Sequence, residues 1–389
     1  MSGRDANDIL RNGGVATLRA AIDVAPEIPR DDALPQPTPK PVLLSKAEFL
    51  AGYTPPDWLV DTILQRRFIY SLTAKTGDGK TAVALLIAQR VAARDRRDAM
   101  LGSHAVDKGT VIYFAGENPD DLRNRMIAAD AKSEHDCSRD RISIIPGTFA
   151  IDAMRAECEA RTAAIPGGKV DLIVVDTSAA YFSDDDENSN SQIGGHARRL
   201  RTLTTLPGGP CVLVLCHPVK NASEQSALLP RGGGAFIAEM DGNLTLWRTD
   251  EITELWHTEK LRGPGFEPLT FRLARTLCDA LLDAKGRQSP TVLAVAITDT
   301  DKDDLARTTR SNEDEILIAM LEQFRPIAAL ATACGWVSSG GEPQKSKAHR
   351  IIKGLERTGL VKKGRGETYE LTERGDKAAK AAARNGATP

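Results

Sequence analysis

Apolar and polar positions alternate along residues 46–288 in a rhythm of short strands and longer helices. Strand-like apolar runs occupy 67–73, 110–115, 142–145, 171–175 and 211–216. Helix-like runs between them cover 81–94, 119–131, 152–164 and the second half of 192–206. The runs DLIVV and CVLVLC are apolar without a break, as in strands that are buried on both faces of a sheet. This alternation predicts an α/β fold in which helices cover a mostly parallel sheet.

Three shorter strand-like runs follow, with the sequences GNLTLWR, ITELWHTEK and PLTFRL. We expect them to extend the sheet, and an antiparallel arrangement is one that they allow.

The rest of the chain differs in pattern from this core. Residues 1–45 form a flexible N-terminal segment, with prolines at short intervals between 26 and 41 that are typical of an extended linker. Residues 13–25 are compatible with one helix before that linker. At the other end of the core, residues 289–311 contain TDTDKDDLARTTRS and are expected to be a polar linker.

Residues 312–383 have the pattern of a separate small domain of three helices and a hairpin. Asn312 is a candidate N-cap for the first helix, NEDEILIAMLEQF. IAALATACG and QKSKAHRIIKGLERTG follow as helices that end at glycines, and LVKKGRGETYELTERG alternates as a hairpin. This order resembles winged-helix domains, in which the third helix enters the major groove of DNA.

The third helix and the hairpin of this domain are rich in basic residues. The helix carries Lys345, Lys347, His349, Arg350 and Lys353, and the hairpin carries Lys362, Lys363 and Arg365. A basic surface of this kind suits the phosphates of duplex DNA. A winged helix that contacts protein instead is the alternative.

Composition narrows the class of protein. The net charge of the 389 residues is −2, so no overall basic field points to nucleic acid, although a local basic patch is compatible with it. The six cysteines are scattered without CxxC or zinc spacing, which favours a reduced, cytoplasmic protein. No apolar stretch approaches the roughly 20 residues that a membrane helix needs, so no membrane partner is expected.

The segment LTAKTGDGKTAVALL passes from a strand through a glycine-rich loop into a helix. It follows the phosphate-loop pattern G-x-x-x-x-G-K-[ST], with Ala74 in place of the first glycine. Gly77 and Gly79 allow the backbone N–H groups to turn towards an anion, and the helix that follows adds its positive end. Lys80 is expected to reach the β and γ phosphates of ATP, and the Thr81 hydroxyl to hold Mg²⁺. The nucleotide-binding residues are therefore expected to be Thr76, Gly77, Asp78, Gly79, Lys80 and Thr81.

Polar side chains follow three of the other predicted strands. Asp176 ends DLIVVD, where open α/β sheets place ligand-binding residues, and a carboxylate there suits Mg²⁺. Glu117 ends TVIYFAGE and is a candidate general base for the attacking water. His217 follows CVLVLC and is a candidate sensor of the γ-phosphate. Capping of the next turn is the alternative for Asp176 and Glu117, and a structural role is the alternative for His217.

Taken in order, these motifs resemble the RecA-like hexameric replicative helicases of the RepA and DnaB type, over residues of about 50–275. The resemblance continues through RGGGAFIAEMDGNLTLWR and EKLRGPGFEPLTFRL. It implies that Glu117 is the catalytic base and that His217 contacts the γ-phosphate region. It also implies a homo-oligomer, a hexameric ring, in which an arginine acts on the site of a neighbouring subunit. Arg231 and Arg262, the latter paired with Lys260 in KLRGPG, are the two candidates, and the sequence leaves the choice open.

The same resemblance implies that two segments line a central channel for single-stranded DNA. They are SDDDENSNSQIGGH at 183–196 and PVKNASEQSALLPRGGG at 218–234. The first is acidic, which is unfavourable for a phosphate backbone. The basic residues Arg198, Arg199, Arg201 and Lys220 are candidates to offset it, and a solvated helix face is the alternative.

Together these patterns predict an ATP hydrolase that uses Mg²⁺ and moves DNA, a RepA-like replicative helicase of a phage, plasmid or mobile element. An ATP-switched DNA-binding regulator or helicase loader that does not translocate is the alternative. A signalling ATPase without a DNA partner is a third interpretation, against which the basic C-terminal domain speaks.

Overall fold

The computed structural model describes residues 15–17, 19, 43–94, 100–133, 137–165, 167–186, 189–220, 222–249, 252–322, 326–338, 340–364 and 368–384. The chain divides into two compact units, residues 1–55 and 56–389. The proline-rich stretch 26–41 and hairpin residue Arg365 lie outside the described residues, so the predictions made for them stay predictions.

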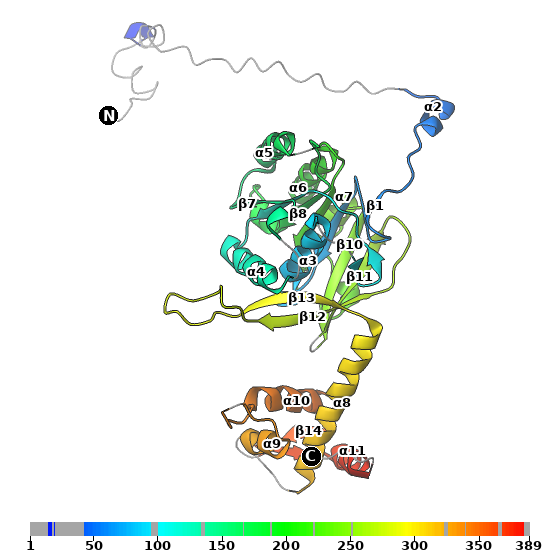
Figure 1. Ribbon diagram of the computed structural model, residues 1–389. Helices are drawn as coiled ribbons and strands as arrows, with labels where there is room; N and C mark the ends of the chain where they lie inside the picture. The colour runs from blue at the N-terminus through cyan, green and yellow to red at the C-terminus, as the bar shows by residue number, and fades with distance from the viewer. Residues whose placement is uncertain are drawn as a thin grey trace. The chain divides into compact units, whose positions relative to one another are not determined.

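The second unit is built around a nine-stranded sheet in the order β13-β12-β11-β10-β3-β9-β8-β6-β7 (Figure 1). Strands β7, β6, β8, β9, β3 and β10 run parallel, and β11, β12 and β13 continue the sheet antiparallel. Their bounds are β3 Ile69–Thr73, β6 Val111–Ala115, β7 Ile142–Pro146, β8 Leu172–Asp176, β9 Cys211–Cys216, β10 Gly242–Thr249, β11 Ile252–Leu261, β12 Leu269–Thr276 and β13 Thr291–Ile297. The predicted α/β class with a mostly parallel sheet is confirmed.

Helices cover both faces of the sheet, because the central strands are apolar on each side. One core cluster joins the sheet to α3 and α4, and a second joins it to α5, α6 and α7. The helices are α3 Lys80–Ala92, α4 Pro119–Lys132, α5 Ile151–Ala164, α6 Asn190–Thr202 and α7 Gly233–Glu239. Pro119 opens α4 as predicted, behind the N-cap Asn118. Helix α6 begins earlier than predicted, because the Ser189 side chain caps it by accepting from the Gln192 amide.

Short elements complete this core. Small antiparallel pairs and single helical turns lie between the main elements: β1 Trp58–Val60, β2 Leu64–Gln65, β4 Met100–Leu101, β5 His104–Ala105, η1 Cys137–Arg139, η2 Ser178–Tyr181, η3 Leu203–Thr205 and η4 Gln225–Ala227. Cys211 and Cys216, at the two ends of β9, are buried thiols.

The structure differs from the polar linker expected at 289–311. Residues Thr291–Ile297 form β13, which pairs with β12 along its whole length. From Asp299 the chain continues as a single helix, α8 Asp299–Glu322. Asn312 is therefore inside a helix and not at its N-cap, and its side-chain amide donates to the Thr308 carbonyl at 2.8 Å. The apolar run TVLAVAI pairs with β12 at the edge of the sheet. A run of this length did not by itself predict a strand.

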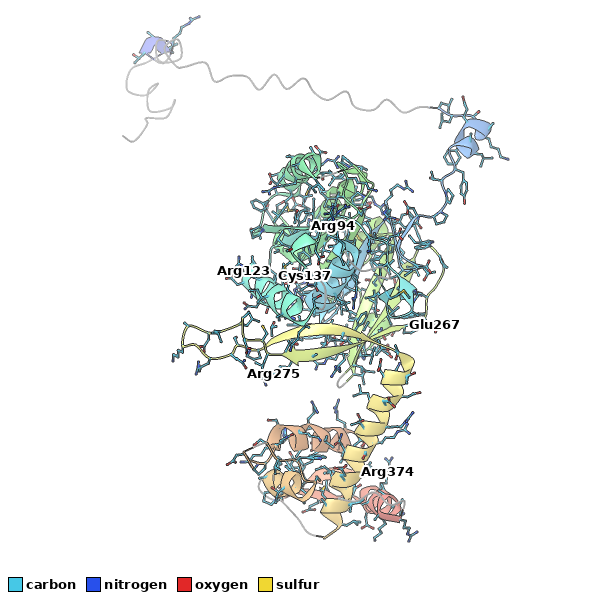
Figure 2. All side chains as sticks on the ribbon, viewed as in Figure 1. Arg94, Arg123, Cys137, Glu267, Arg275 and Arg374 are labelled. Atoms are coloured by element: carbon cyan, nitrogen blue, oxygen red, sulfur yellow. The ribbon has the colours of Figure 1, made fainter. Side chains whose placement is uncertain are left out.

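The C-terminal part has its own apolar core, built from α8, α9, α10, α11 and the β14–β15 hairpin. The bounds are α9 Ile327–Ala333, α10 Lys345–Arg357, β14 Val361–Lys363, β15 Tyr369–Leu371 and α11 Glu373–Arg384. The three helices and the hairpin occur in the predicted order. Helix α11, which begins beside the labelled Arg374, is an addition that the sequence analysis did not predict (Figure 2). Assignment to the winged-helix class stays a prediction.

The first unit is described at Val15–Thr17 and Arg19, which are helical, and from residue 43 onwards. Helix α2, Lys46–Ala51, starts at a reciprocal cap: the Ser45 amide donates to Glu48 Oε2 at 2.8 Å, and the Glu48 amide donates to Ser45 Oγ at 3.2 Å. Among the described helices of both units, none is long and apolar enough to cross a membrane.

Candidate active site

The predicted phosphate loop lies between β3 and α3, at the carboxyl edge of the parallel strands. Gly77 and Gly79 have φ values of +91° and +96°, in the region that side chains other than glycine rarely adopt. A Cβ atom at Gly79 would also come within 2.7 Å of Leu273 on β12. Thr76 is exposed at the turn, and Gly79 caps the helix that begins at Lys80. The loop therefore presents the amino end of α3 to an anion.

Lys80 is buried inside this loop, with its charge held by backbone oxygens. Its Nζ donates to the Ala74 carbonyl at 2.7 Å and to the Lys75 carbonyl at 3.2 Å. Burial lowers the pKa of Lys80, and the carboxylates of Glu117 and Asp176 act in the opposite direction. The ammonium group is thus held by carbonyls of the loop itself, contacts that the predicted phosphates would replace.

Asp176 ends β8 and is almost fully buried. Tyr113 Oη donates to its Oδ2 at 2.8 Å, and no group of the described residues donates to its Oδ1. Burial raises the pKa of Asp176 to about 6, although hydrogen bonds from Tyr113 and from the Thr81 hydroxyl favour the ionised form.

Thr81 and Asp176 therefore fit the predicted Mg²⁺ site. A hard cation prefers a hydroxyl and a carboxylate oxygen of this kind and takes its other ligands from water and phosphate. No group of three or more His, Cys, Asp or Glu side chains gathers as a metal site within the described part of the chain. The described residues therefore do not form a site in which protein side chains alone surround a metal ion.

Strand register brings Glu117 and His217 to the same edge. Ala115 pairs with Asp176 and Thr73 pairs with Cys216, so the residues after these strands are neighbours. His217 Nε2 lies 3.7 Å from Glu117 Oε2, and about half of the Glu117 side chain is exposed. Burial and the charge of Lys80 lower the pKa of His217. The site thus combines an accessible carboxylate with an imidazole whose neutral form is favoured.

Three residues that sequence reasoning missed support the phosphate loop from β10 and β11. Arg248 Nη1 donates to the Gly77 carbonyl at 3.2 Å, and Thr253 Oγ1 donates to the Asp78 carbonyl at 3.2 Å. The Lys75 ammonium lies 4.6 Å from the centroid of the Trp247 ring. These contacts join residues about 170 positions apart, so no local pattern could have indicated them.

Arg231 lies at this same edge in its own chain. Its amide donates to the His217 carbonyl at 2.8 Å, and its charge contributes to the lowered pKa of His217. The segment 218–230 is therefore closed at its base, with Pro218 and Pro230 bridged. Of the two candidate arginines, Arg231 is the one beside the chain's own site.

Lys260 and Arg262 lie at the opposite edge of the sheet. Leu261 pairs with Gly242, which pairs with Tyr70 near the start of β3, while the phosphate loop follows Thr73 at the other end. Arg262 Nη1 donates to Asp241 Oδ1 at 2.8 Å. Lys260 Nζ donates to the Ile237 and Ala238 carbonyls at 2.9 and 2.8 Å, at the end of α7. The strand length alone puts about 10 Å between these residues and the chain's own loop.

The three arginines expected to offset the acidic segment are hydrogen-bonded to neighbouring groups. Arg199 Nη2 lies 2.5 Å from Asp184 Oδ2, within that segment. Arg198 Nη1 donates to Glu239 Oε1 at 3.2 Å, and Arg201 Nε donates to the Glu239 carbonyl at 2.8 Å. Lys220 is exposed. Acidic side chains and a carbonyl thus partly neutralise the three arginines that were expected to offset the acidic segment.

The basic helix of the C-terminal part is α10, which has an exposed face and a buried one. Ala348, Ile351, Ile352 and Leu355 are buried in the core, whereas Lys345, His349, Arg350 and Lys353 are exposed. Lys347 is engaged elsewhere, because its Nζ lies 4.0 Å from the Trp336 ring centroid. Lys345, His349 and Lys353 are spaced four residues apart and so lie along one side of α10, and Lys353 also forms an ion pair with Glu356.

Comparison with known proteins gives one family match and several distant structural likenesses. Residues 35–223 match a family model described as an AAA domain, and the phosphate loop falls within that range. No curated protein matches the chain. The chain is similar to a solved structure described as an ATPase domain (16% identity, 57% of this chain and 84% of that chain covered, TM-score 0.41).

Two further solved structures resemble the chain with similar sequence identities and TM-scores. A DnaB-like replicative helicase, described with its interactions with primase, shares 16% identity over 54% of this chain and 56% of its own, with a TM-score of 0.42. A KaiC-like protein from Pyrococcus horikoshii OT3 shares 14% identity over 56% of this chain and 90% of its own, with a TM-score of 0.37. This chain spans just over half of that helicase chain. The fold assignment accordingly rests on the strand order and register described above.

Proposed function

We propose that the protein is an ATP-dependent DNA motor, a RepA-type replicative helicase of a phage, plasmid or mobile element. The observation that carries this proposal is the meeting of Lys80, Asp176, Glu117 and His217 at one edge of the sheet. They end or follow the four neighbouring strands β3, β8, β6 and β9, and their motifs occur along the sequence in the order Lys80, Glu117, Asp176 and His217. ATP is the substrate that such a set would bind and hydrolyse.

In this proposal each side chain has a distinct task. Lys80 binds the β and γ phosphates, and Glu117 orients the attacking water and accepts its proton. Glu117 is about half exposed and so accessible to that water, whereas Asp176 is almost fully buried. His217 donates or accepts a hydrogen bond near the γ-phosphate. A bound Mg²⁺, held by Thr81 and Asp176, would neutralise phosphate charge.

The position of Arg262 supports the proposal of a ring of identical subunits. A trans-acting arginine must come from a surface that faces another subunit's loop, and an arginine beside its own loop already serves its own site. Arg262 lies at the edge away from the chain's own loop and is more than half exposed, which supports it as the trans residue. Arg231 is then a cis contact of the γ-phosphate region. The expected assembly is a hexamer.

The DNA contacts are proposed for two places. Single-stranded DNA would pass along the two predicted channel segments, 183–196 and 218–234, at the parts that precede α6 and α7, residues 183–189 and 218–232. Duplex DNA would contact the exposed face of α10 in the C-terminal domain, whose cations lie together.

One observation favours the second candidate function, an ATP-switched DNA-binding regulator or loader. The acidic segment binds Arg199 and leaves little positive charge for a strand there. In that interpretation α10 alone holds DNA, and ATP changes the conformation without translocation.

ATP turnover of the full chain, measured with single-stranded DNA, with duplex DNA and without DNA, tests the proposal. We expect stimulation by single strands that persists in a chain ending at residue 298, and ATP-dependent separation of a forked duplex by the full chain. Stimulation that requires α10 and prefers duplex, without strand separation, would assign the protein to the regulator or loader class instead.

A further inference from the structure

His196 is a fully buried histidine that the proposed reaction does not use. It lies on α6 with no exposed surface, and its Nε2 is 3.0 Å from the Ser178 hydroxyl oxygen. Ser178 follows Asp176 by two residues, so this hydrogen bond links α6 directly to the end of β8. A buried polar group is costly unless it is hydrogen-bonded, so an imidazole at this position is held by a specific partner.

The imidazole also contacts the base of each proposed DNA segment. Phe182, which directly precedes the first segment, packs edge-on against it with ring centroids 5.3 Å apart. Phe236 lies on α7, directly after the second segment, and its ring centroid is 6.3 Å away. The N-cap of α7 supplies a closer backbone contact with α6, because a Cβ atom at Gly232 would lie 2.4 Å from Ile193 Cγ1.

Ser178 joins this group to the nucleotide edge by a second route. Ser178 begins η2, which packs against β9, and Cys216 at the end of β9 directly precedes His217. Ser178, Cys216, His217 and Arg231 line one small hollow. A continuous set of contacts therefore runs from His217 through Cys216 and Ser178 to His196, and from there to both segments.

We propose that His196 is a positioning residue that transmits the state of the nucleotide site to the segments 183–189 and 218–232. The Ser178–His196 hydrogen bond is directional, so a shift at the ends of β8 and β9 on nucleotide binding carries α6 with it. Because Phe182 and Phe236 pack on the same imidazole, both segments move together. This inference rests on the proposed function for the role of the two segments in DNA binding. The coupling from the nucleotide site to the segments through His196 does not depend on that role.

Two variants remove the Ser178–His196 hydrogen bond, each by changing one of its two partners. His196→Phe keeps an aromatic ring in the core without a polar atom, and Ser178→Ala deletes only the hydroxyl. His196→Gln is the conservative variant, because its amide can reach the position of Nε2. Thr162→Val is the matched control, since Thr162 is equally buried and its hydroxyl donates to the Cys158 carbonyl within α5.

The first measurement is amide hydrogen exchange over residues 189–196 of the full chain, with and without ADP and a non-hydrolysable ATP analogue. In the wild type and in Thr162→Val we expect the nucleotides to change the exchange rate. In His196→Phe and Ser178→Ala that difference is lost although the nucleotide still binds, and His196→Gln restores it. This measurement needs no DNA, so it separates failure of the link from failure of the proposed function.

The second measurement is the ratio of DNA-stimulated to basal ATP turnover. His196→Phe should keep basal turnover within about twofold and lower the ratio by roughly three- to tenfold. Ser178→Ala should add nothing to that loss in the double variant, because both changes break the same bond. A His196→Phe chain with normal nucleotide-dependent exchange and a normal ratio would make His196 a packing residue only and overturn the proposal. So would equal losses in Thr162→Val.

Discussion

Among the described residues, Lys80 and Asp176 are charged side chains that the fold buries at the carboxyl edge of the parallel strands. Burial lowers the pKa of Lys80 and raises that of Asp176, and each charge partly offsets the effect of burial on the other. Phosphates and a metal ion bound at the proposed site would favour the charged form of both side chains. Binding is therefore expected to be coupled to the ionisation of Asp176.

The two candidate catalytic residues can be separated by substitution. Lys80→Ala removes the charge that meets the phosphates, so nucleotide binding and turnover should both be lost. Glu117→Gln removes only the base, so binding should persist while turnover falls by about 10²- to 10⁴-fold. Titration with a fluorescent ATP analogue and steady-state phosphate release measure the two quantities. Wild-type turnover in Glu117→Gln would exclude it as the base.

The raised pKa of Asp176 predicts a pH-dependent stability in the absence of nucleotide and metal. The folded protein keeps a proton on Asp176 up to about pH 6, whereas the unfolded chain loses it near the ordinary value of 3.8. Stability therefore falls as pH rises through this window and levels off above it. Asp176→Asn does not titrate, so above pH 6 it should be more stable than the wild type by about 3 kcal/mol, and equally stable near pH 4.

Urea denaturation at several pH values checks this difference. Asp120→Asn, at an exposed position on α4, is the control and should follow the wild type. A constant gap between Asp176→Asn and the wild type at all pH values would contradict the assignment.

At the scale of elements, the sequence predicted the parts whose signals are local. The continuous apolar runs identify β8 and β9, and the glycines with Lys80 and Thr81 identify the loop. The distant supports Trp247, Arg248 and Thr253 could not be predicted, because their contacts depend on the pairing of β10 with β3 and β11. The strand β13 was missed for a similar reason: its seven residues become a strand only beside β12. The roles of Glu117, His217 and the arginines stay predictions.

The C-terminal domain gives a prediction at this scale. Because α8 begins at Asp299, a fragment of residues 299–389 keeps the whole apolar core of the domain. We expect it to bind duplex DNA without ATP, with an affinity that falls steeply with salt as counterions are released. Replacing Lys345, Arg350 and Lys353 by alanine should weaken binding and flatten the salt dependence.

Fluorescence anisotropy with a labelled duplex measures both effects. Lys377→Ala with Lys380→Ala on α11 is the control for the loss of positive charge elsewhere in the fragment, since both lysines are exposed. A fragment that does not bind DNA even at low salt would make the domain a protein-docking module.

At the scale of the whole molecule, the two edges of the sheet have different chemistry. The carboxyl edge carries the loop, Glu117 and Arg231, and the opposite edge carries Lys260 and Arg262. A site that needs groups from both edges is complete only where the opposite edge of one subunit faces the phosphate loop of the next subunit.

Subunit mixing tests this arrangement. Lys80→Ala and Arg262→Ala subunits are each expected to be inactive alone, since a trans arginine is worth about 10³-fold or more in rate. Their mixture should recover part of the activity, because some interfaces pair an intact loop with an intact arginine. Arg231→Ala, a cis contact, should give no such recovery with Lys80→Ala. Light scattering that shows a monomer with ATP and Mg²⁺ present would exclude the ring.

The position of β3 has a consequence for how the chain acquires its site during synthesis. This strand precedes the phosphate loop by position in the chain, yet in the sheet it lies between β9 and β10, whose residues follow about 140 to 175 positions later. On the ribosome the loop emerges early and has neither neighbour to pair with. A nascent chain arrested before β10 should therefore fail to retain ATP, and the ability to bind nucleotide should appear abruptly once residues up to about 280 have left the exit tunnel.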